Sequence, residues 1–212
     1  MTSADTVTTI YLVDDDAAFL AAMSRFLRAA GFVVVACQSA PDLLSGVSPQ
    51  TRGCIVADLE MPGVSGLELQ LLLTARGVAM PVVFLTGHGD IPSSVRAMRE
   101  GAVDFLEKVA PQEELLAAIA RALERDARMH AERARLEERR RRLAVLTTRE
   151  RHVLALVVRG KMNKQIAAVL GIQERTVKLH RTAISSKLGV RAAAQLAVLV
   201  SEAHLPEIDA TQ

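Results

Sequence analysis

The sequence predicts a doubly wound parallel α/β domain followed by an all-α module. Between residues 9 and 123, short apolar runs alternate with helical patterns five times, and the continuously apolar runs are typical of strands covered on both faces. After residue 146, short helical patterns are separated by single glycines, which is typical of a helix-turn-helix. The 212 residues, half of them hydrophobic, leave room for two compact domains.

The predicted strands and helices of the first half follow one another in strict alternation. The apolar runs lie at residues 9–13, 32–36, 54–57, 82–85 and 103–106, and the helical patterns lie at residues 17–30, 41–46, 66–75, 92–100 and 112–123. Glycines at residues 31, 53, 77 and 101 fall where helices end and strands begin. We therefore expect a five-stranded parallel sheet with helices on both faces.

Residues 124–145 form a different kind of segment. They are rich in Glu, Arg and Ala, contain no glycine or proline, and predict a long solvated linker helix. Apolar residues recur every seven positions from Ala122 to Leu143, but the intervening heptad positions are charged, so the coiled-coil signal is weak. We expect at most loose pairing in a dimer. The arginine run at 139–142 indicates a solvated face, with DNA-phosphate contact as the alternative.

The C-terminal module contains four predicted helices. Thr147 or Thr148 can cap the first helix, and Asn163 can cap the second. The helices are expected at residues 148–159, 163–170, 173–188 and 191–203. The tight turn at Gly171 between the second and third helices predicts a helix-turn-helix.

Charge divides the chain into unlike halves. Residues 1–123 contain 8 Lys and Arg against 14 Asp and Glu, a net charge of −6, whereas residues 124–212 contain 18 against 10, a net charge of +8. This asymmetry indicates a polyanion partner for the second half only.

The remaining composition favours a cytoplasmic protein without a membrane partner. Cys37 and Cys54 lie in apolar strand-like runs, which favours buried reduced thiols over a disulfide framework. The N-terminus lacks the pattern of a signal peptide. No apolar run approaches the roughly 20 residues that a membrane helix needs.

Carboxylates gather at the predicted strand ends. Asp14, Asp15 and Asp16 follow the first strand directly, and Asp58 follows the third. In the flavodoxin-like strand order these two strands are neighbours, so Asp14, Asp15 and Asp58 converge at one edge of the sheet. Oxygen-only ligands favour Mg²⁺, and no His or Cys cluster favours zinc. The alternative, a turn with a helix cap, suits Asp16.

The fourth and fifth strand ends add a hydroxyl and an ammonium group. Thr86 follows the fourth strand, and Lys108 follows the fifth. Carboxylates beside these two donors form a site for a phosphoryl group, whose oxygens Lys108 can neutralise and Thr86 can hydrogen-bond. The obvious nucleophile is a carboxylate, which would give an acyl phosphate.

A specific combination of motifs runs through the first half. The stretches are Val-Asp-Asp-Asp at 13–16, Asp-Leu-Glu-Met-Pro-Gly at 58–63, Ser-Gly at 65–66, Thr-Gly-His-Gly-Asp at 86–90 and Gly-Ala-Val-Asp-Phe-Leu-Glu-Lys at 101–108. With them, residues 8–123 resemble the receiver domain of bacterial two-component response regulators.

The resemblance implies a role for each site residue. It implies that Asp58 is the phosphoacceptor, and that Mg²⁺ is held by Asp15, Asp58 and the backbone carbonyl of Glu60, with Asp14 acting largely through water. It also implies Thr86 and Phe105 as a switch pair. On phosphorylation, Thr86 would move toward the phosphoryl group and the Phe105 ring would turn inward, remodelling the surface around the fourth helix and fifth strand.

One position departs from the receiver pattern. Receivers usually carry a proline after the lysine, joined by a cis bond, whereas Val109 follows Lys108 here. A cis bond before valine would cost about 2.5–4 kcal/mol, so we expect a trans bond and a different loop. An alternative, DNA binding without a phosphoryl switch, rests on this position alone.

The third predicted helix of the C-terminal module has two contrasting faces. At 100° per residue, Val177, Ile184 and Leu188 share one buried stripe. The opposite face is polar and basic, and comprises Arg175, Lys178, Leu179, Thr182 and Ser186. Such a helix fits the major groove of DNA, while Arg181, between the stripes, can reach a phosphate or stay solvated.

A second specific combination of motifs runs through the C-terminal module. They are Leu-Thr-Thr-Arg-Glu at 146–150, Asn-Lys-Gln-Ile-Ala at 163–167, Leu-Gly-Ile at 170–172, Thr-Val-Lys at 176–178 and Lys-Leu-Gly-Val at 187–190. Residues 146–203 thereby resemble the LuxR-type helix-turn-helix. The resemblance implies that Lys178, Leu179 and Thr182 lie near base edges, and it suggests phosphate contacts from Lys164, Thr176 and Arg181.

Together the parts resemble the FixJ/NarL class of response regulators. The expected division is a receiver at 1–123, a helical linker at 124–145 and a DNA-binding module at 146–212. The favoured hypothesis is a transcription regulator that a sensor histidine kinase phosphorylates and that then dimerises, releases its helix-turn-helix, or both, to bind promoter DNA and engage RNA polymerase. A phosphohydrolase with an aspartyl nucleophile is disfavoured, because the sequence shows no lid, no second substrate segment and no P-loop.

Overall fold

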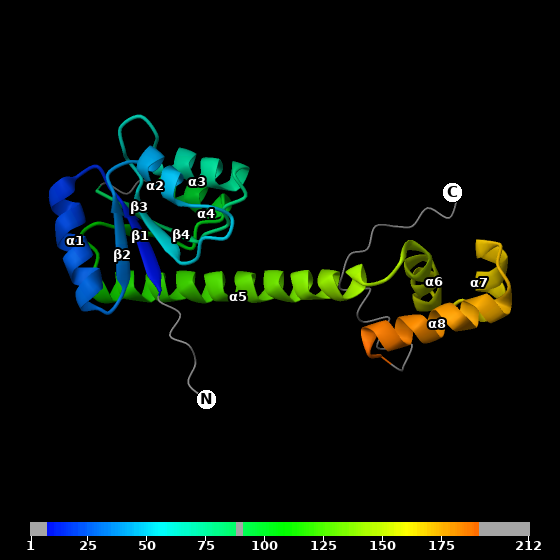
Figure 1. Cartoon of the computed structure of the whole chain (residues 1–212). Coiled ribbons are helices and arrows are strands. Elements are labelled where there is room, and N and C mark those ends of the chain that lie inside the picture. The colour runs from blue at the N-terminus through cyan, green and yellow to red at the C-terminus, as the bar shows by residue number, and fades with distance from the viewer. Residues whose placement is uncertain (1–7, 88–90, 191–212) are drawn as a thin grey trace. The chain divides into compact units, whose positions relative to one another are not determined.

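The structure is a computed structural model that describes residues 8–87 and 91–190 (Figure 1). The chain forms two compact units, Met1–Met129 and His130–Gln212. The boundary between the units falls within the long helix α5 (Gln112–Ala144). Each unit is described by itself.

The N-terminal unit is built on a five-stranded parallel sheet, which confirms the predicted fold class. The strands are β1 (Thr9–Val13), β2 (Val33–Cys37), β3 (Cys54–Asp58), β4 (Val82–Thr86) and β5 (Asp104–Glu107), in the order β2-β1-β3-β4-β5. In register, Asp58 pairs with Leu85, and Thr86 pairs with Glu107. The carboxyl ends of β3, β4 and β5 therefore lie level at one edge.

Helices cover both faces of this sheet, as the alternating pattern predicts. They are α1 (Ala17–Ala29), α2 (Ala40–Gly46), α3 (Gly66–Ala75), α4 (Ile91–Arg99) and the first part of α5. Side chains of Asp16, Ser39 and Ser65 accept backbone hydrogen bonds at the starts of α1, α2 and α3, which fixes where these helices begin.

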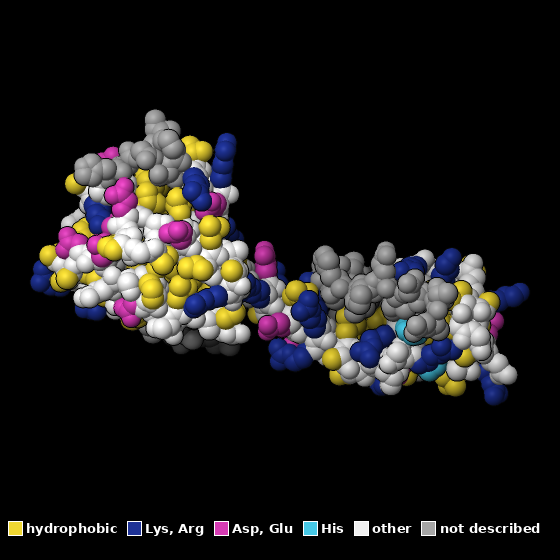
Figure 2. All heavy atoms as spheres, turned by 90° about the horizontal axis from the view of Figure 1, so that it is seen from above, with side chains coloured by type: hydrophobic (Ala, Val, Ile, Leu, Met, Phe, Trp, Pro, Cys, Tyr) yellow, Lys and Arg dark blue, Asp and Glu magenta, His cyan; other side chains and the backbone are white. Residues whose placement is uncertain are grey.

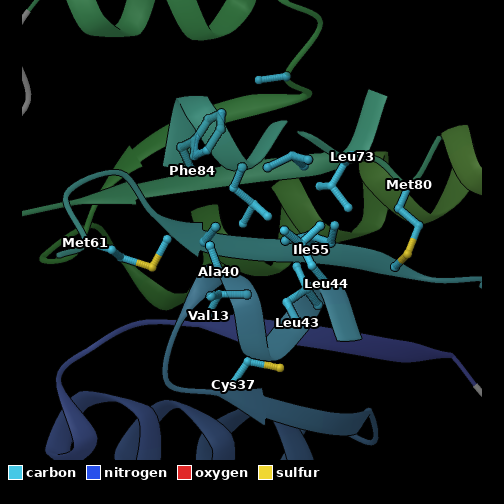
Figure 3. Packing of buried hydrophobic residues seen from close by; sticks show 14 of the residues in the cluster. Val13, Cys37, Ala40, Leu43, Leu44, Ile55, Met61, Leu73, Met80 and Phe84 are labelled. Carbon is cyan, nitrogen blue, oxygen red and sulfur yellow. The ribbon is translucent and has the colours of Figure 1, made fainter. Parts of the chain in front are cut away.

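Two cores lie on opposite faces of the sheet. On one face, Val13, Ile55 and Phe84 pack with residues of α2 and α3, as Figure 3 shows for Leu43, Leu44 and Leu73. On the other face, strand residues such as Ile10 and Leu12 pack with α1 and α5. The alternation along β1 follows from the two-residue side-chain period of a strand.

Cys37 and Cys54 are free and buried, as expected. Burial raises the pKa of the Cys37 thiol to about 11 and that of the Cys54 thiol to about 12. Both thiols therefore stay protonated near neutral pH, and the thiolate needed for reaction or metal binding is scarce.

The first turn of the predicted solvated linker contains a buried carboxylate. Asp126 is only 4% exposed, and its carboxylate lies 3.3 Å from the Arg52 guanidinium group. Arg125 also donates a hydrogen bond to the Gly101 carbonyl oxygen. Helix α5 thus continues to pack on the N-terminal unit beyond residue 123, because charged side chains there find partners at the amino-terminal edge of the sheet.

The C-terminal unit contains α6 (Thr148–Val158), α7 (Asn163–Leu170) and α8 (Glu174–Leu188). Its core gathers Leu146, Leu154, Ile166, Val177 and Ile184. The predicted fourth helix at 191–203 lies outside the described residues.

The ends of these helices settle two capping predictions. Thr147, not Thr148, caps α6, and its hydroxyl accepts from the Glu150 amide while the Glu150 carboxylate accepts from the Thr147 amide. The prediction that Asn163 caps α7 is wrong. Asn163 is the first helical residue, and its side chain accepts a hydrogen bond from Arg181 instead. Gly171 ends α7 in the left-handed conformation, with a φ of 63°.

Within the described residues, no helix is both long enough and apolar enough to span a membrane.

Candidate functional site

Three carboxylates meet at the carboxyl edge of the sheet. Asp14 follows β1 and Asp58 ends β3, and these two residues are 1% and 6% exposed, whereas Asp15 is exposed. One oxygen from each of the three side chains lies within 4.8 Å of the others. The convergence predicted from strand order is thus present in the structure, and Asp16 stands apart as the cap of α1.

Lys108 balances part of this negative charge. Its ammonium nitrogen lies 2.6 Å from Asp14 Oδ2 and 2.9 Å from Asp58 Oδ2. The backbone holds the lysine in place, because the Lys108 amide donates to the Thr86 carbonyl oxygen at 2.8 Å. None of the described peptide bonds is cis, so the bond to Val109 is trans, as expected.

Burial and pairing act in opposite directions on these groups. Burial raises the pKa of Asp14, and the Lys108 hydrogen bond offsets this only in part. Burial also opposes protonation of Lys108, but hydrogen bonds to Asp14 and Asp58 outweigh it and raise the pKa of the lysine. Lys108 therefore stays charged near neutral pH, and the cluster retains an excess of negative charge.

The donor set fits a magnesium ion. Three carboxylate oxygens from Asp14, Asp15 and Asp58 lie close together, and among the described residues Lys108 is the cation that pairs with them. Mg²⁺ prefers oxygen ligands and keeps several waters, which the exposed position of Asp15 allows. The residues present could therefore hold this ion.

The switch candidates occupy the two adjacent strands. Thr86 is fully buried at the end of β4. Phe105 lies on β5 opposite Phe84 and is partly buried against the core formed with α2, α3 and α4. Glu60 lies just beyond β3, exposed, with its amide donating to Asp58 Oδ1 at 3.3 Å. The structure thus brings Lys108 into contact with Asp14 and Asp58 and places Asp15 close to both carboxylates, with Thr86 on the neighbouring strand end.

The exposed face of α8 agrees with the sequence pattern. Val177, Ile184 and Leu188 are buried. Arg175, Lys178, Leu179, Thr182 and Ser186 are all exposed. Leu179 is 69% exposed, which is unusual for a leucine on a polar face and suits apolar contact with a thymine methyl group. Figure 2 shows Lys and Arg side chains spread over the visible surface of this unit, with few acidic ones.

The residues predicted to contact DNA phosphates differ in their exposure and hydrogen bonding. Lys164 is exposed on α7, and Thr176 is half-buried at the start of α8. Arg181 is half-buried, and its guanidinium group donates to Asn163 Oδ1 at 2.8 Å. Arg181 therefore joins α8 to the start of α7. The sequence alone predicts that it either reaches a phosphate or stays solvated, and does not predict this contact.

Comparison with known proteins gives the family. Residues 10–120 match the family described as response regulator receiver domain, and residues 144–200 match bacterial regulatory proteins of the luxR family. Transcriptional regulatory protein FixJ of Azorhizobium caulinodans is 42% identical over 95% of this chain and 96% of its own length. The chain belongs to the response regulator family.

Two further relatives cover similar lengths of this response regulator. Nodulation protein W of Bradyrhizobium diazoefficiens is 40% identical, over 92% of this chain and 86% of its own. The solved structure of response regulator StyR matches with a TM-score of 0.82 and 44% identity, over 93% of this chain and all of StyR. A receiver joined to a luxR-type DNA-binding module is the arrangement of a two-component transcription regulator.

Sequence reasoning missed Gly66 as a residue that shapes the loop after Asp58. A Cβ atom at this position would lie 2.5 Å from the Asp58 carbonyl oxygen and 2.9 Å from the Phe84 ring. The Gly66 amide also donates to the Leu59 carbonyl oxygen. In the sequence the Ser-Gly pair at 65–66 is visible only as a motif. Glycine is required at position 66 because α3 starts in direct contact with the end of β3.

Sequence reasoning also missed Phe19. The Lys108 ammonium nitrogen lies 4.6 Å from the centre of the Phe19 ring. An aromatic residue in the first turn of the helix that follows the acidic run was the available signal. Sequence alone could not show that this ring turns toward the fifth strand.

Proposed function

We propose that this response regulator is a phosphorylation-controlled, sequence-specific DNA-binding transcription regulator. The observation that carries the proposal is the cluster of Asp58, Asp14 and Lys108 at the sheet edge, in a chain that also presents the exposed basic face of α8. We assign the switch to residues 1–123, the linker to 124–145 and the DNA-binding module to 146–212.

Asp58 is the phosphoacceptor in this proposal. A carboxylate oxygen of Asp58 attacks the phosphorus atom of a phosphohistidine on a sensor histidine kinase. The new P–O bond forms as the P–N bond breaks, and the imidazole nitrogen keeps the electron pair. Lys108 neutralises the phosphoryl oxygens, and the Thr86 hydroxyl donates to one of them.

The other acidic residues serve this step. Asp15, Asp58 and the Glu60 carbonyl would hold Mg²⁺, with Asp14 acting largely through water. Bound there, the ion supplies positive charge for the phosphoryl oxygens and reduces the repulsion between the carboxylates. Asp14 also pairs with Lys108, at 2.6 Å, and so keeps the ammonium group beside Asp58.

The response to phosphorylation involves Thr86 and Phe105. Thr86 moves toward the phosphoryl group, and the Phe105 ring turns inward in its place. This remodels the surface of α4 and β5, where Val95 and Met98 are exposed. That surface then pairs with a second copy, the helix-turn-helix is released, or both.

DNA recognition falls to α8. Lys178, Leu179 and Thr182 read base edges, Arg175 lies on the same face, and phosphate contacts come from Lys164, Thr176 and Arg181. Two modules of a dimer bind a two-fold promoter site and engage RNA polymerase there. The proposed role in transcription implies a location in the cytoplasm. It requires no catalytic turnover of a separate substrate.

An Asp58→Ala variant tests the switch. Acetyl phosphate should increase binding of the wild type to a promoter duplex recovered by genome-wide DNA capture, and the variant should show no increase. Glu113→Ala, which removes an exposed carboxylate at the start of α5, should respond like the wild type. Undiminished stimulation of Asp58→Ala would contradict the mechanism.

A second measurement separates this proposal from DNA binding without a switch. Beryllofluoride, a phosphoryl mimic, should bind the wild type in the presence of Mg²⁺ and increase its dimerisation in sedimentation experiments. Binding without any change in dimerisation or DNA affinity would favour the alternative that rests on Val109.

A further inference from the structure

Phe19 is held at the edge of the phosphoacceptor site by the start of α1. The Asp16 carboxylate accepts hydrogen bonds from the Ala18 and Phe19 amides, at 2.8 and 3.1 Å. This cap fixes the first turn of the helix, and Phe19 is half-buried against the core formed with α5. The ring is therefore anchored on two sides, by the cap through its backbone and by the core through its side chain.

The ring faces Lys108, the cation that pairs with the acidic cluster. The Lys108 nitrogen lies 4.6 Å from the ring centre, within the range of a cation–π interaction. On its other side the same nitrogen contacts Asp14 and Asp58. The lysine side chain is only 20% exposed, so little water screens these contacts. Lys108 is thus held between two carboxylates and an aromatic face.

The chain around Lys108 gives its side chain little other support. The Lys108 amide is fixed by the Thr86 carbonyl oxygen, but this bond restrains the backbone only. The next residue, Val109, is 85% exposed and so gives the lysine little packing support. The direction of the ammonium group therefore depends on the groups that touch it.

We propose that Phe19 is a positioning residue for phosphoryl transfer, which acts by holding the Lys108 ammonium group; this inference rests on the proposed function of Asp58. Before the reaction, Lys108 contacts the Asp58 carboxylate, the same group that must bond to the incoming phosphoryl group. As an Asp58 oxygen becomes bonded to phosphorus, the ammonium group must follow the negative charge onto the phosphoryl oxygens.

The ring makes this movement easier. The negative face of the ring stabilises the ammonium group more in the displaced position, where Asp58 no longer neutralises its charge, than in the resting pair, so the transition state gains more from the ring than the ground state does. Without the ring, Lys108 is bound more tightly to the carboxylates in the ground state and is less well placed in the transition state. Phosphorylation should then become slower, although Asp58, Asp14 and Lys108 are all present.

The test uses the full-length chain, acetyl phosphate and Mg²⁺. Phe19→Leu should slow phosphorylation by about 2- to 30-fold, the factor that corresponds to a cation–π interaction of ordinary strength. A sharper arm replaces Phe19 with mono-, di- and trifluorinated phenylalanine. These rings keep their shape but have a progressively weaker negative face, so the rate should fall stepwise across the series.

Phe26 provides the matched control. It lies seven residues further along α1 and is half-buried in the same core. Fluorination of Phe26 should leave the rate unchanged. An equal decline in the Phe26 series would overturn the proposal, because it would indicate a general effect on folding.

The contact itself has an independent signature. In the wild type, NMR should show the Lys108 ε-protons shifted upfield by the ring, and Phe19→Leu should abolish the shift. A missing shift, or equal rates across the Phe19 series in a reactive protein, would overturn the role of Phe19 alone. A wild type that takes up no phosphoryl group would overturn the proposed function, and the role of Phe19 with it.

Discussion

The three consecutive aspartates after β1 have three different environments. Asp14 is buried and pairs with Lys108, Asp15 is exposed beside it, and Asp16 caps α1. Hydrogen bonds from the Phe19 and Ala18 amides lower the pKa of Asp16, whereas burial raises the pKa of Asp14. One short run of identical residues thus supplies the metal-site candidates, the lysine partner and the helix cap.

An Asp14→Asn substitution tests whether repulsion between the clustered carboxylates lowers the stability of the N-terminal unit. Removing one buried carboxylate relieves repulsion within the cluster, and Lys108 keeps Asp58 as a partner. Without Mg²⁺ we expect the free energy of unfolding to rise by on the order of 1 kcal/mol. Mg²⁺ at ten times the Kd of the wild type should raise the unfolding free energy of the wild type by about 1.4 kcal/mol. At the same Mg²⁺ concentration, the unfolding free energy of the variant should rise clearly less. Urea unfolding with and without Mg²⁺ measures both quantities; a destabilised variant with a full response to Mg²⁺ would contradict this account.

Gly66 should be among the least replaceable small residues of the N-terminal unit. In Gly66→Ala the added methyl group would meet the Asp58 carbonyl oxygen at 2.5 Å, so α3 and the phosphoacceptor loop must separate. Overpacking of this kind costs about 1–3 kcal/mol. We expect a lower urea midpoint together with slower phosphorylation by acetyl phosphate. Gly46→Ala is the control, because nothing lies within 4 Å of its added methyl group; equal behaviour of the two variants would show that the close approach has no effect.

The sequence could predict the carboxylate cluster but not its neighbours. Asp14, Asp58 and Lys108 converge because parallel strands end at the same edge, and strand order follows from the alternating pattern. The contacts of Gly66 and Phe19 depend on how far α3 and α1 approach the sheet and how each helix is rotated. Those quantities are set by packing across the whole core, which no local pattern contains.

At the scale of elements, α6 is fixed at its start by one carboxylate with several partners. Glu150 accepts from the Thr147 amide at 2.8 Å and lies 2.7 Å from the Lys187 ammonium nitrogen on α8. Its side chain is only 7% exposed. The same residue therefore completes the capping box and joins the first and third helices of the unit.

Glu150 should make the C-terminal unit sensitive to acid. The hydrogen bond from Lys187 is the main cause that lowers the pKa of Glu150, so this group stabilises the folded state fully above its ordinary pKa of about 4.5. The contribution is lost as the pH falls through the lowered pKa. In Glu150→Gln, the difference in urea midpoint from the wild type should be large at pH 7 and shrink below pH 4.5. Glu174→Gln removes a 49% exposed carboxylate 3.8 Å from Lys178 and should show little difference at any pH; a constant difference for Glu150→Gln would contradict this assignment.

Element boundaries were predictable where a local signal sets them. Gly171 ends α7 and the Thr147 capping box begins α6 through local backbone geometry. The sequence located Gly171 and left Thr147 and Thr148 as alternatives for the cap. The prediction for Asn163 was wrong because its side-chain oxygen accepts a hydrogen bond from Arg181, which lies 18 residues away. Asp126, inside the stretch predicted to be solvated, is charged yet buried against Arg52. In both cases a distant partner decides the role of a polar residue.

At the scale of the whole molecule, the small net charge of +2 hides two unlike parts. The negative charge of residues 1–123 includes the carboxylates that surround Asp58, and the positive charge of residues 146–212, a net of +5, includes the exposed face of α8. The linker at 124–145 adds a net of +3, although some of its arginines pair within the helix, as Arg142 does with Glu138 at 3.4 Å. DNA binding should therefore depend on local charge in the C-terminal unit and not on the net charge of the chain.

Salt dependence provides the test, because each phosphate contact contributes about 0.9 to the slope of log K against log salt concentration. Lys164→Ala should reduce this slope by about 0.9 and weaken binding to the captured promoter duplex and to a scrambled duplex equally. Lys178→Ala should weaken binding to the promoter duplex by about 1–3 kcal/mol more than to the scrambled one, because it removes the proposed base contact. Arg25→Ala makes the same change in net charge at an exposed position on α1 and should alter neither quantity. If Arg25→Ala changed the slope as much as Lys164→Ala does, the net charge of the chain, and not a phosphate contact on α7, would control DNA affinity.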